Sequence, residues 1–216
     1  MTIRVLIADD QDLIRSGLKA ILDAQPGISV VGEASDGRHA VFLARKLKPD
    51  VCLFDIRMPE MDGLQATREL AGPKVEDPMA IVIITTFDLD EYIYGALKAG
   101  ARGFLLKDAG PELLVQAIEA AAAGDALIAP NVTTRLLSTF ARTSTSPAPV
   151  QPFQPLTGRE EEVLLAVARG RMNQEIAGEL FMSISTVKTH LSSLMGKVNA
   201  RNRVELAIWA YETGRM

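Results

Sequence analysis

Four short apolar segments of the chain end in side chains that could together hold a phosphoryl group. These side chains are Asp9, Asp10, Asp55, Thr85 and Lys107. Carboxylate oxygens with room for water suit Mg²⁺, whereas two scattered histidines are too few for a zinc site. A metal ion, an ammonium group and a hydroxyl group around one carboxylate would position a phosphoryl group and neutralise its charge.

The segments that precede these residues are predicted to be strands of one parallel sheet. The expected strands are Val5–Ala8, Ser29–Ala34, Val51–Phe54, Ile81–Thr85 and Gly103–Leu106. Amphipathic stretches lie between them, for example Val41, Phe42, Ala44 and Leu47 at helical spacing. This alternation predicts an α/β fold, a (βα)5 doubly wound parallel sheet of the flavodoxin-like type. The first and third strands of such a sheet are neighbours, so the acids should converge at its carboxyl edge.

Each of these residues also has a simpler explanation when it is taken alone. An acidic pair after a strand is more often a helix cap or a solvated turn. Thr85 would be an ordinary strand former and Lys107 an ordinary surface lysine. Because all of them fall at the same end of successive predicted strands, a shared site is the better interpretation.

Composition predicts two domains in a reducing compartment. The 216 residues are 48% hydrophobic, which is enough for two small cores. Residues 1–155 carry 15 Lys/Arg and 20 Asp/Glu, whereas residues 156–216 carry 8 and 7, so the C-terminal part is the candidate for an anionic partner. Cys52 is the only cysteine, which excludes an internal disulfide. No signal-like start and no apolar stretch of ~18 residues occurs, so we expect a cytoplasmic protein without a membrane partner.

The domain boundaries are expected near residues 125 and 155. Residues 1–125 form the α/β domain, residues 126–155 a linker, and residues 156–216 an all-α domain. The linker would hold a short helix over 130–137, followed by the Pro- and Ser-rich "TSTSPAPVQPFQP" (143–155).

Capping residues predict four helices in the C-terminal domain. Thr157 and Glu160 form a capping box before a helix over 161–169. Asn173, Ser183 and Asn202 are the expected caps of three more helices, the last ending near residue 214.

The third of these helices carries a positive face opposite its apolar face. Val187, Leu191, Leu194 and Val198 repeat at steps of four, three and four, which predicts a core-facing stripe. The other face carries Lys188 among small hydroxyl residues, and no acid occurs between Glu179 and Glu205. A helix-turn-helix that reads a DNA major groove would have this pattern. On charge alone, a solvated helix face in a small bundle is equally acceptable.

The N-terminal motifs resemble a response-regulator receiver domain. They are Asp9–Asp10, "DIRMPEMDG" (55–63), "VIITT" (82–86) and "GFLLKD" (103–108). The resemblance implies that Asp55 is the phospho-acceptor, taking its phosphoryl group from a histidine of a partner sensor histidine kinase. It further implies a Mg²⁺ ion held by Asp10, Asp55 and the carbonyl of Arg57, with Asp9 in support. Lys107 would pair with the phosphoryl oxygens, and Thr85 and Phe104 would be the switch residues.

The C-terminal motifs are similar to the LuxR-type helix-turn-helix, and the whole chain resembles NarL/FixJ-family response regulators. The motifs are "LTGREEEVL" (156–164), "NQEIA" (173–177) and "STVKTHL" (185–191). The resemblance implies a scaffold helix over 173–180 and a recognition helix over 184–198. The implied contacts with double-stranded DNA are Lys188, Thr189 and Ser192 in the groove and Thr186, Lys197 and Arg203 at phosphates.

Taken together, these patterns predict a transcriptional regulator that is not an enzyme. Phosphorylation or DNA binding would favour a homodimer, paired through the last helix. A phosphatase of the haloacid dehalogenase type is one alternative, but it wants a second acid where this chain has Arg57. A regulator that acts by protein contact alone is the other alternative.

The residue two positions after Thr85 predicts a long-lived phosphoryl group. Phe87 is bulky and apolar, and it would flank the path of the water that hydrolyses the phosphorylated form. We expect Phe87→Glu to speed the decay of phosphorylated protein, followed by loss of the phosphoryl mass with time. An unchanged decay rate would remove the argument.

Overall fold

The chain forms two compact units in a computed structural model, residues 1–129 (the sheet unit) and 130–216 (the helical unit). The structure describes residues 2–86, 90–125, 127–128, 152, 154–200 and 203–215. Phe87, the predicted helix over 130–137, most of the predicted linker and Asn202 lie outside the described residues. Within the described part, no helix is long and apolar enough to cross a bilayer.

A parallel sheet with the order β2-β1-β3-β4-β5-β6 forms the centre of the sheet unit. Its strands are β1 (Ile3–Ala8), β2 (Ile28–Ala34), β3 (Val51–Phe54), β4 (Ile81–Thr85), β5 (Gly103–Leu106) and β6 (Leu127–Ile128). Five of them confirm the predicted (βα)5 fold, and three have the predicted bounds. The two-residue β6, which pairs with β5, was not predicted because it is too short to show periodicity.

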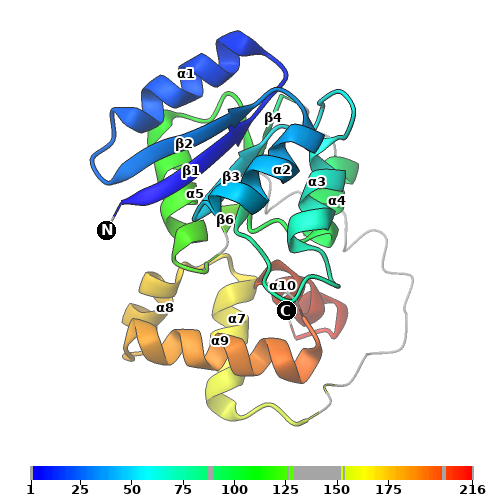
Figure 1. Cartoon of the computed structure of the whole chain (residues 1–216). Coiled ribbons are helices and arrows are strands. Elements are labelled where there is room, and N and C mark those ends of the chain that lie inside the picture. The colour runs from blue at the N-terminus through cyan, green and yellow to red at the C-terminus, as the bar shows by residue number, and fades with distance from the viewer. Residues whose placement is uncertain are drawn as a thin grey trace. The chain divides into compact units, whose positions relative to one another are not determined.

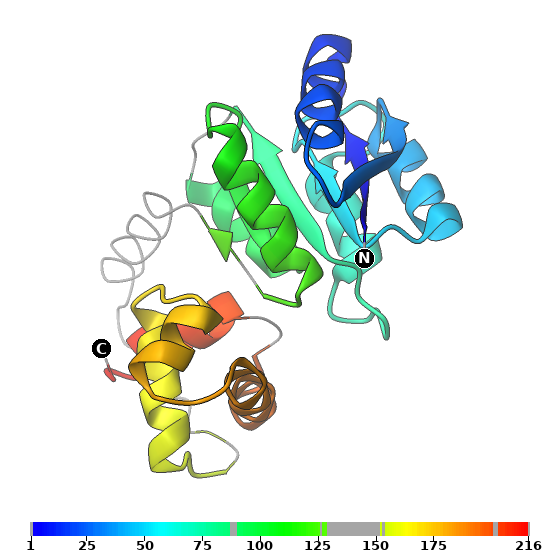
Figure 2. The same ribbon diagram turned by 90° about the vertical axis from the view of Figure 1, so that its left-hand side faces the viewer.

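Helices cover both faces of this sheet. They are α1 (Asp12–Asp23), α2 (Gly37–Leu47), α3 (Gly63–Ala71), α4 (Asp90–Ala99) and α5 (Pro111–Ala122). Helices α1 and α5 lie on one face, and α2, α3 and α4 lie on the other (Figures 1 and 2). Because both faces are covered, β3 and β4 are buried along their whole length, as expected for central strands of a parallel sheet.

The helical unit contains four described helices around one core. They are α7 (Gly158–Ala168), α8 (Asn173–Glu179), α9 (Ile184–Val198) and α10 (Arg203–Glu212). The predicted stripe of α9 is buried in this core together with α7 and α10 residues. Its apolar spacing therefore predicted correctly which face turns inward.

Two of the predicted helix caps are confirmed and one is wrong. Thr157 and Glu160 form the capping box of α7, and Ser183 accepts a hydrogen bond from the amide of Thr186 at 3.1 Å. Asn173 is not a cap, because α8 begins one residue earlier than expected and Met172 is its N-cap. The Asn173 side chain is instead buried and accepts a hydrogen bond from Arg203.

Candidate functional site

Strand register brings the predicted acids to one edge of the sheet. Ala8 on β1 pairs with Phe54 on β3, so the residues that follow them, Asp9 and Asp55, emerge side by side. The amide of Asp55 donates to the carbonyl of Ala8 at 2.8 Å, which extends the pairing by one residue. Carboxylate oxygens of Asp9, Asp10 and Asp55 lie within 4.8 Å of one another.

Lys107 joins this group from the end of β5, which lies two strands away from β3 in the sheet. Its amide donates to the carbonyl of Thr85 at 2.9 Å, which places the residue just past the β4–β5 pairing. Its Nζ lies 2.6 Å from Asp9 Oδ2 and 3.1 Å from Asp55 Oδ2, and only 7% of the side chain is exposed. We call Asp9, Asp10, Asp55 and Lys107 the acidic edge.

Burial and charge act against each other at the acidic edge. Burial raises the pKa of the Asp55 carboxyl, and the neighbouring Lys107 ammonium offsets this only in part. For Lys107, burial lowers the pKa, but the carboxylates of Asp9 and Asp55 more than compensate and the net pKa is raised. Lys107 is therefore held as a cation against two carboxylates, ready to pair with a further anionic group.

The loop after Asp55 is held close to the acidic edge by Gly63. The amide of Gly63 donates to the carbonyl of Ile56 at 2.8 Å. A Cβ atom at Gly63 would lie 1.9 Å from the carbonyl oxygen of Asp55, so no larger residue fits without moving the loop. The glycine of "DIRMPEMDG" is therefore required sterically, because it lets the start of α3 contact the backbone at the end of β3.

The remaining predicted residues of this site have distinct environments. Thr85 and Phe104 are fully buried on β4 and β5. Arg57 is exposed and donates from Nη2 to the hydroxyl of Tyr92 on α4 at 3.1 Å. This contact was not predicted, because Arg57 and Tyr92 lie far apart in the sequence and no spacing pattern connects them.

The donor set of the acidic edge suits a hard divalent cation. Asp9 Oδ1 already accepts from the amide of Gln11 at 3.0 Å, and its other oxygen faces Lys107. Asp10 is exposed, whereas Asp55 is buried, so a bound ion would contact both protein oxygens and solvent. This arrangement fits Mg²⁺, which keeps several waters and takes one or two carboxylates.

The outer face of α9 carries the predicted groove residues Lys188, Thr189 and Ser192 and one of the predicted phosphate contacts, Thr186. Thr186, Lys188, Thr189 and Ser192 are all exposed. Thr189 Oγ1 donates to the carbonyl of Ser185 at 3.0 Å, and Thr186 Oγ1 lies 2.8 Å from Ser183 Oγ, so both hydroxyl groups are oriented by their own helix. These side chains present hydroxyl groups and one ammonium group to solvent along one face of α9.

Lys197 and Arg203, the other two predicted phosphate contacts, make contacts inside the helical unit. Lys197 Nζ lies 2.7 Å from Glu160 Oε2, and its side chain is 17% exposed. Arg203 Nη1 donates to Asn173 Oδ1 at 2.8 Å. Lys197 therefore links α9 to α7, and Arg203 links α10 to α8.

Glu160 connects the start of α7 to α9. It is 4% exposed, and it accepts hydrogen bonds from Lys197, from Ser193 Oγ at 2.7 Å and from the amide of Thr157 at 2.7 Å. Burial alone would raise the pKa of this carboxyl, but these donors, led by Lys197, lower it to about 2. Glu160 was predicted only as a capping residue, although its spacing from Val163, Leu164 and Val167 places it on the apolar face of the helix.

Family models match both units of the chain. Residues 5–119 match the response regulator receiver domain, and residues 154–210 match the luxR family of bacterial regulatory proteins. The transcriptional regulatory protein LiaR of Bacillus subtilis (strain 168) is 41% identical over 209 residues, which cover 97% of this chain and 97% of LiaR.

Solved structures show the same combination of units. The response regulator ChrA of a heme-sensing two-component system is 36% identical, with a TM-score of 0.54, over 100% of this chain and 99% of ChrA. A complex of the two-component response regulator RcsB with DNA is 25% identical, with a TM-score of 0.58, over 98% and 99% of the two chains.

Proposed function

The chain belongs to the response regulators that combine a receiver domain with a LuxR-type DNA-binding domain, and we propose that phosphorylation of Asp55 controls its binding to DNA through α9. The observation that supports Asp55 most strongly is the acidic edge, where three carboxylates meet one buried lysine. Transcription regulation is the function of this family.

Phosphoryl transfer at Asp55 requires a carboxylate oxygen, a donor and charge neutralisation. One Asp55 oxygen would form the new bond to phosphorus while the bond from phosphorus to a histidine nitrogen of a sensor kinase breaks. The other ring nitrogen of that phosphohistidine would carry a proton, so the ring would take the electron pair of the broken bond and leave as neutral imidazole. Asp10, Asp55 and the Arg57 carbonyl would hold Mg²⁺, supported by Asp9, and the ion would neutralise charge on the phosphoryl oxygens. Lys107 would exchange its contact with Asp55 for a phosphoryl oxygen, since its Nζ already lies 3.1 Å from the acceptor.

The proposed switch is supported by the position of Thr85 at the end of the strand next to β3, with Phe104 on the following strand. Thr85 ends the strand next to β3, and its backbone already bonds to Lys107. A phosphoryl group on Asp55 would offer the Thr85 hydroxyl a new acceptor. Movement of Thr85 toward this acceptor would leave space into which the Phe104 ring would turn. New contacts of this kind would shift the sheet unit from one surface conformation to another.

DNA recognition is assigned to the exposed face of α9. Lys188, Thr189 and Ser192 would face the major groove, and Thr186 would contact a phosphate. Lys197 and Arg203 would contact phosphates only by giving up part of their bonds to Glu160 and Asn173. Binding as a homodimer would present two copies of α9 to two half-sites, with the partly buried face of α10 as the proposed contact.

Lys188→Glu is expected to weaken DNA binding strongly at low salt. The change replaces a cation on the recognition face with an anion beside the phosphate backbone. Affinity for a promoter fragment should fall roughly tenfold or more, and the salt dependence should flatten. Glu179→Gln, at the end of α8, is the matched control and should bind as the original chain does.

The alternative of a regulator that acts by protein contact alone makes the opposite prediction. A helical unit that docks only another protein has no salt-dependent DNA affinity to lose. Electrophoretic shifts that are identical for the original chain and Lys188→Glu would therefore favour protein contact.

A further inference from the structure

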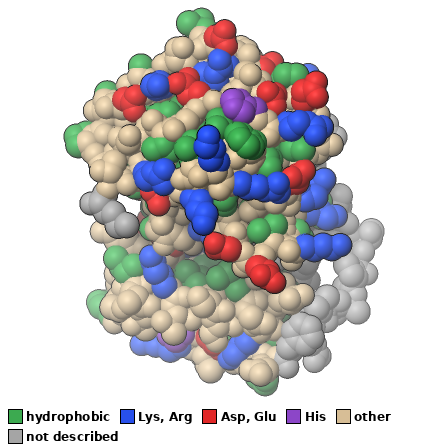
Figure 3. Space-filling view, viewed as in Figure 1, with side chains coloured by type: hydrophobic (Ala, Val, Ile, Leu, Met, Phe, Trp, Pro, Cys, Tyr) green, Lys and Arg blue, Asp and Glu red, His purple; other side chains and the backbone are tan. Residues whose placement is uncertain are grey.

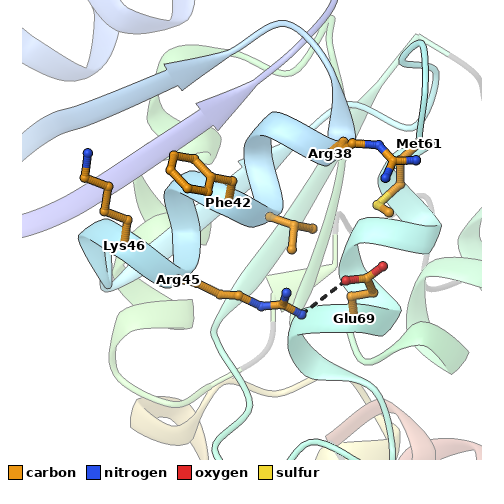
Figure 4. Close-up of a pocket in the computed structure, with 7 residues that line it drawn as sticks. Arg38, Phe42, Arg45, Lys46, Met61 and Glu69 are labelled. Carbon is orange, nitrogen blue, oxygen red and sulfur yellow. Dashed lines mark hydrogen bonds and ion pairs between the residues drawn. The ribbon is translucent and has the colours of Figure 1, made fainter.

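A hollow of about 510 Å³ lies between α2 and α3, and none of the residues that line it belongs to the acidic edge. It is lined by Arg38, Val41, Phe42, Arg45, Lys46, Met61 and Glu69. Figure 4 shows that α2 supplies most of these side chains, with Met61 and Glu69 facing them from the neighbouring loop and α3. The volume is large enough for one or two side chains of another molecule.

An exposed aromatic ring stands at this hollow. Phe42 is 59% exposed, although the helical spacing of the apolar residues placed it among those that should turn inward. Its ring stacks on that of His39 with centroids 6.5 Å apart, and Lys46 Nζ lies 5.8 Å from the ring centroid. A large apolar side chain held at the surface in this way is typical of an interface residue.

The charge around Phe42 is opposite to that of the sheet unit as a whole. Residues 1–129 contain 13 Lys/Arg and 20 Asp/Glu, but no acid occurs between Asp36 and Asp50. Of the cations that line the hollow, Arg45 lies 3.1 Å from Glu69, the one acid among the lining residues. Figure 3 shows Lys and Arg side chains gathered beside apolar ones over α2.

The wall of the hollow is fixed by close backbone packing. Asp36 caps α2 by accepting from the amide of His39 at 2.8 Å. A Cβ atom at Gly37 would lie 2.2 Å from the carbonyl oxygen of Met61, so the start of α2 contacts the Met61 loop directly. A site that is already formed costs little ordering when a ligand binds.

From these observations we propose that the hollow between α2 and α3 docks an acidic segment of another protein, with a large apolar side chain inserted beside Phe42. The acids of the segment would pair with Arg38 and Lys46, and its apolar side chain would cover Phe42, Val41 and Met61. Arg, Met and Phe are the residue types enriched in protein interfaces, and this site has all three.

An acidic peptide suits this site better than a nucleic acid does. The lining between the cations is apolar, which suits a segment that carries a large apolar side chain and does not suit a continuous phosphate backbone. A long polyanion would also be repelled by the net negative charge of residues 1–129. A short segment is influenced mainly by the cations within about 10 Å.

The test is a titration of the full chain with the blocked peptide Glu-Glu-Phe-Glu-Glu, followed by amide shifts in nuclear magnetic resonance spectra. Saturable shifts are expected in α2 and around Met61. The peptide Glu-Glu-Ser-Glu-Glu should bind the original chain roughly tenfold more weakly, and Phe42→Ser and Arg38→Glu chains should bind the phenylalanine peptide more weakly by a similar factor. Lys98→Glu, which removes an exposed cation on α4, is the matched control and should leave the shifts unchanged.

Three results would overturn the proposal. The first is the absence of saturable shifts in α2 with the phenylalanine peptide. The second is equal binding by the original chain and by Phe42→Ser, since the aromatic anchor would then contribute nothing. The third is self-association of the chain, measured by sedimentation, that Phe42→Ser abolishes, because the hollow would then serve a second copy.

Discussion

Asp55→Asn is expected to reduce phosphoryl uptake to background when the chain is incubated with an acyl phosphate and Mg²⁺. An amide has no anionic oxygen to attack phosphorus, and the exposed Asp10 lies beside the acceptor position without occupying it. The substitution is nearly isosteric, and Lys107 keeps its 2.6 Å contact with Asp9, so the fold should persist. Intact-protein mass spectrometry gives the uptake directly.

The control for this variant is Asp77→Asn. Asp77 is exposed in the loop between α3 and β4 and lies outside the acidic edge, so its replacement should leave uptake unchanged. Uptake by Asp55→Asn with the amplitude of the original chain would move the phospho-acceptor to another residue and remove the proposed role of Asp55.

Glu160→Ala is expected to lower the free energy of unfolding of the helical unit by about 3 kcal/mol. It removes the buried acceptor of Lys197, Ser193 and the Thr157 amide in one step, and loss of one partner from a buried ion pair is strongly destabilising. Trp209, the only tryptophan of the chain, is 6% exposed in the core of this unit, so its fluorescence in urea reports the unfolding of this unit.

Two further measurements make the Glu160 prediction specific. Glu162→Ala removes an exposed acid of the same helix that pairs with Arg159, and it should change stability by less than about 1 kcal/mol. The pKa of Glu160 is lowered from 4.5 to about 2, so its charge stabilises the native state fully above the higher value. The stability difference between the original chain and Glu160→Gln should therefore shrink as pH falls from 4.5 toward 2. A difference that is constant over this pH range would contradict the assignment.

The acidic edge was predictable because parallel strands convert sequence position into spatial position. Once β1 and β3 were expected to be neighbours, the residues that follow them had to emerge together, and the register of Ala8 with Phe54 confirms the reasoning. Lys107 was found in the same way, since it follows β5. The steric role of Gly63 was not predictable, because it depends on how closely the loop approaches the carbonyl of Asp55.

Side chains that link distant elements were harder to predict. Periodicity identified the buried stripe of α9, yet it could not say that Lys197 would bond to Glu160 or Arg203 to Asn173. For Phe42 the helical spacing was misleading, because it fits a core position while the side chain is 59% exposed. In each case the outcome depends on the neighbours that tertiary packing supplies, which helical spacing alone does not contain.

Control of DNA binding by Asp55 is tested most directly by the affinity of the full chain for a promoter fragment with and without beryllofluoride and Mg²⁺, which together mimic the phosphorylated aspartate. We expect an affinity about tenfold higher with the mimic, and no increase in Asp55→Asn. Equal affinities with and without the mimic, at a concentration where mass spectrometry shows it bound, would contradict the claim that the acidic edge controls DNA binding.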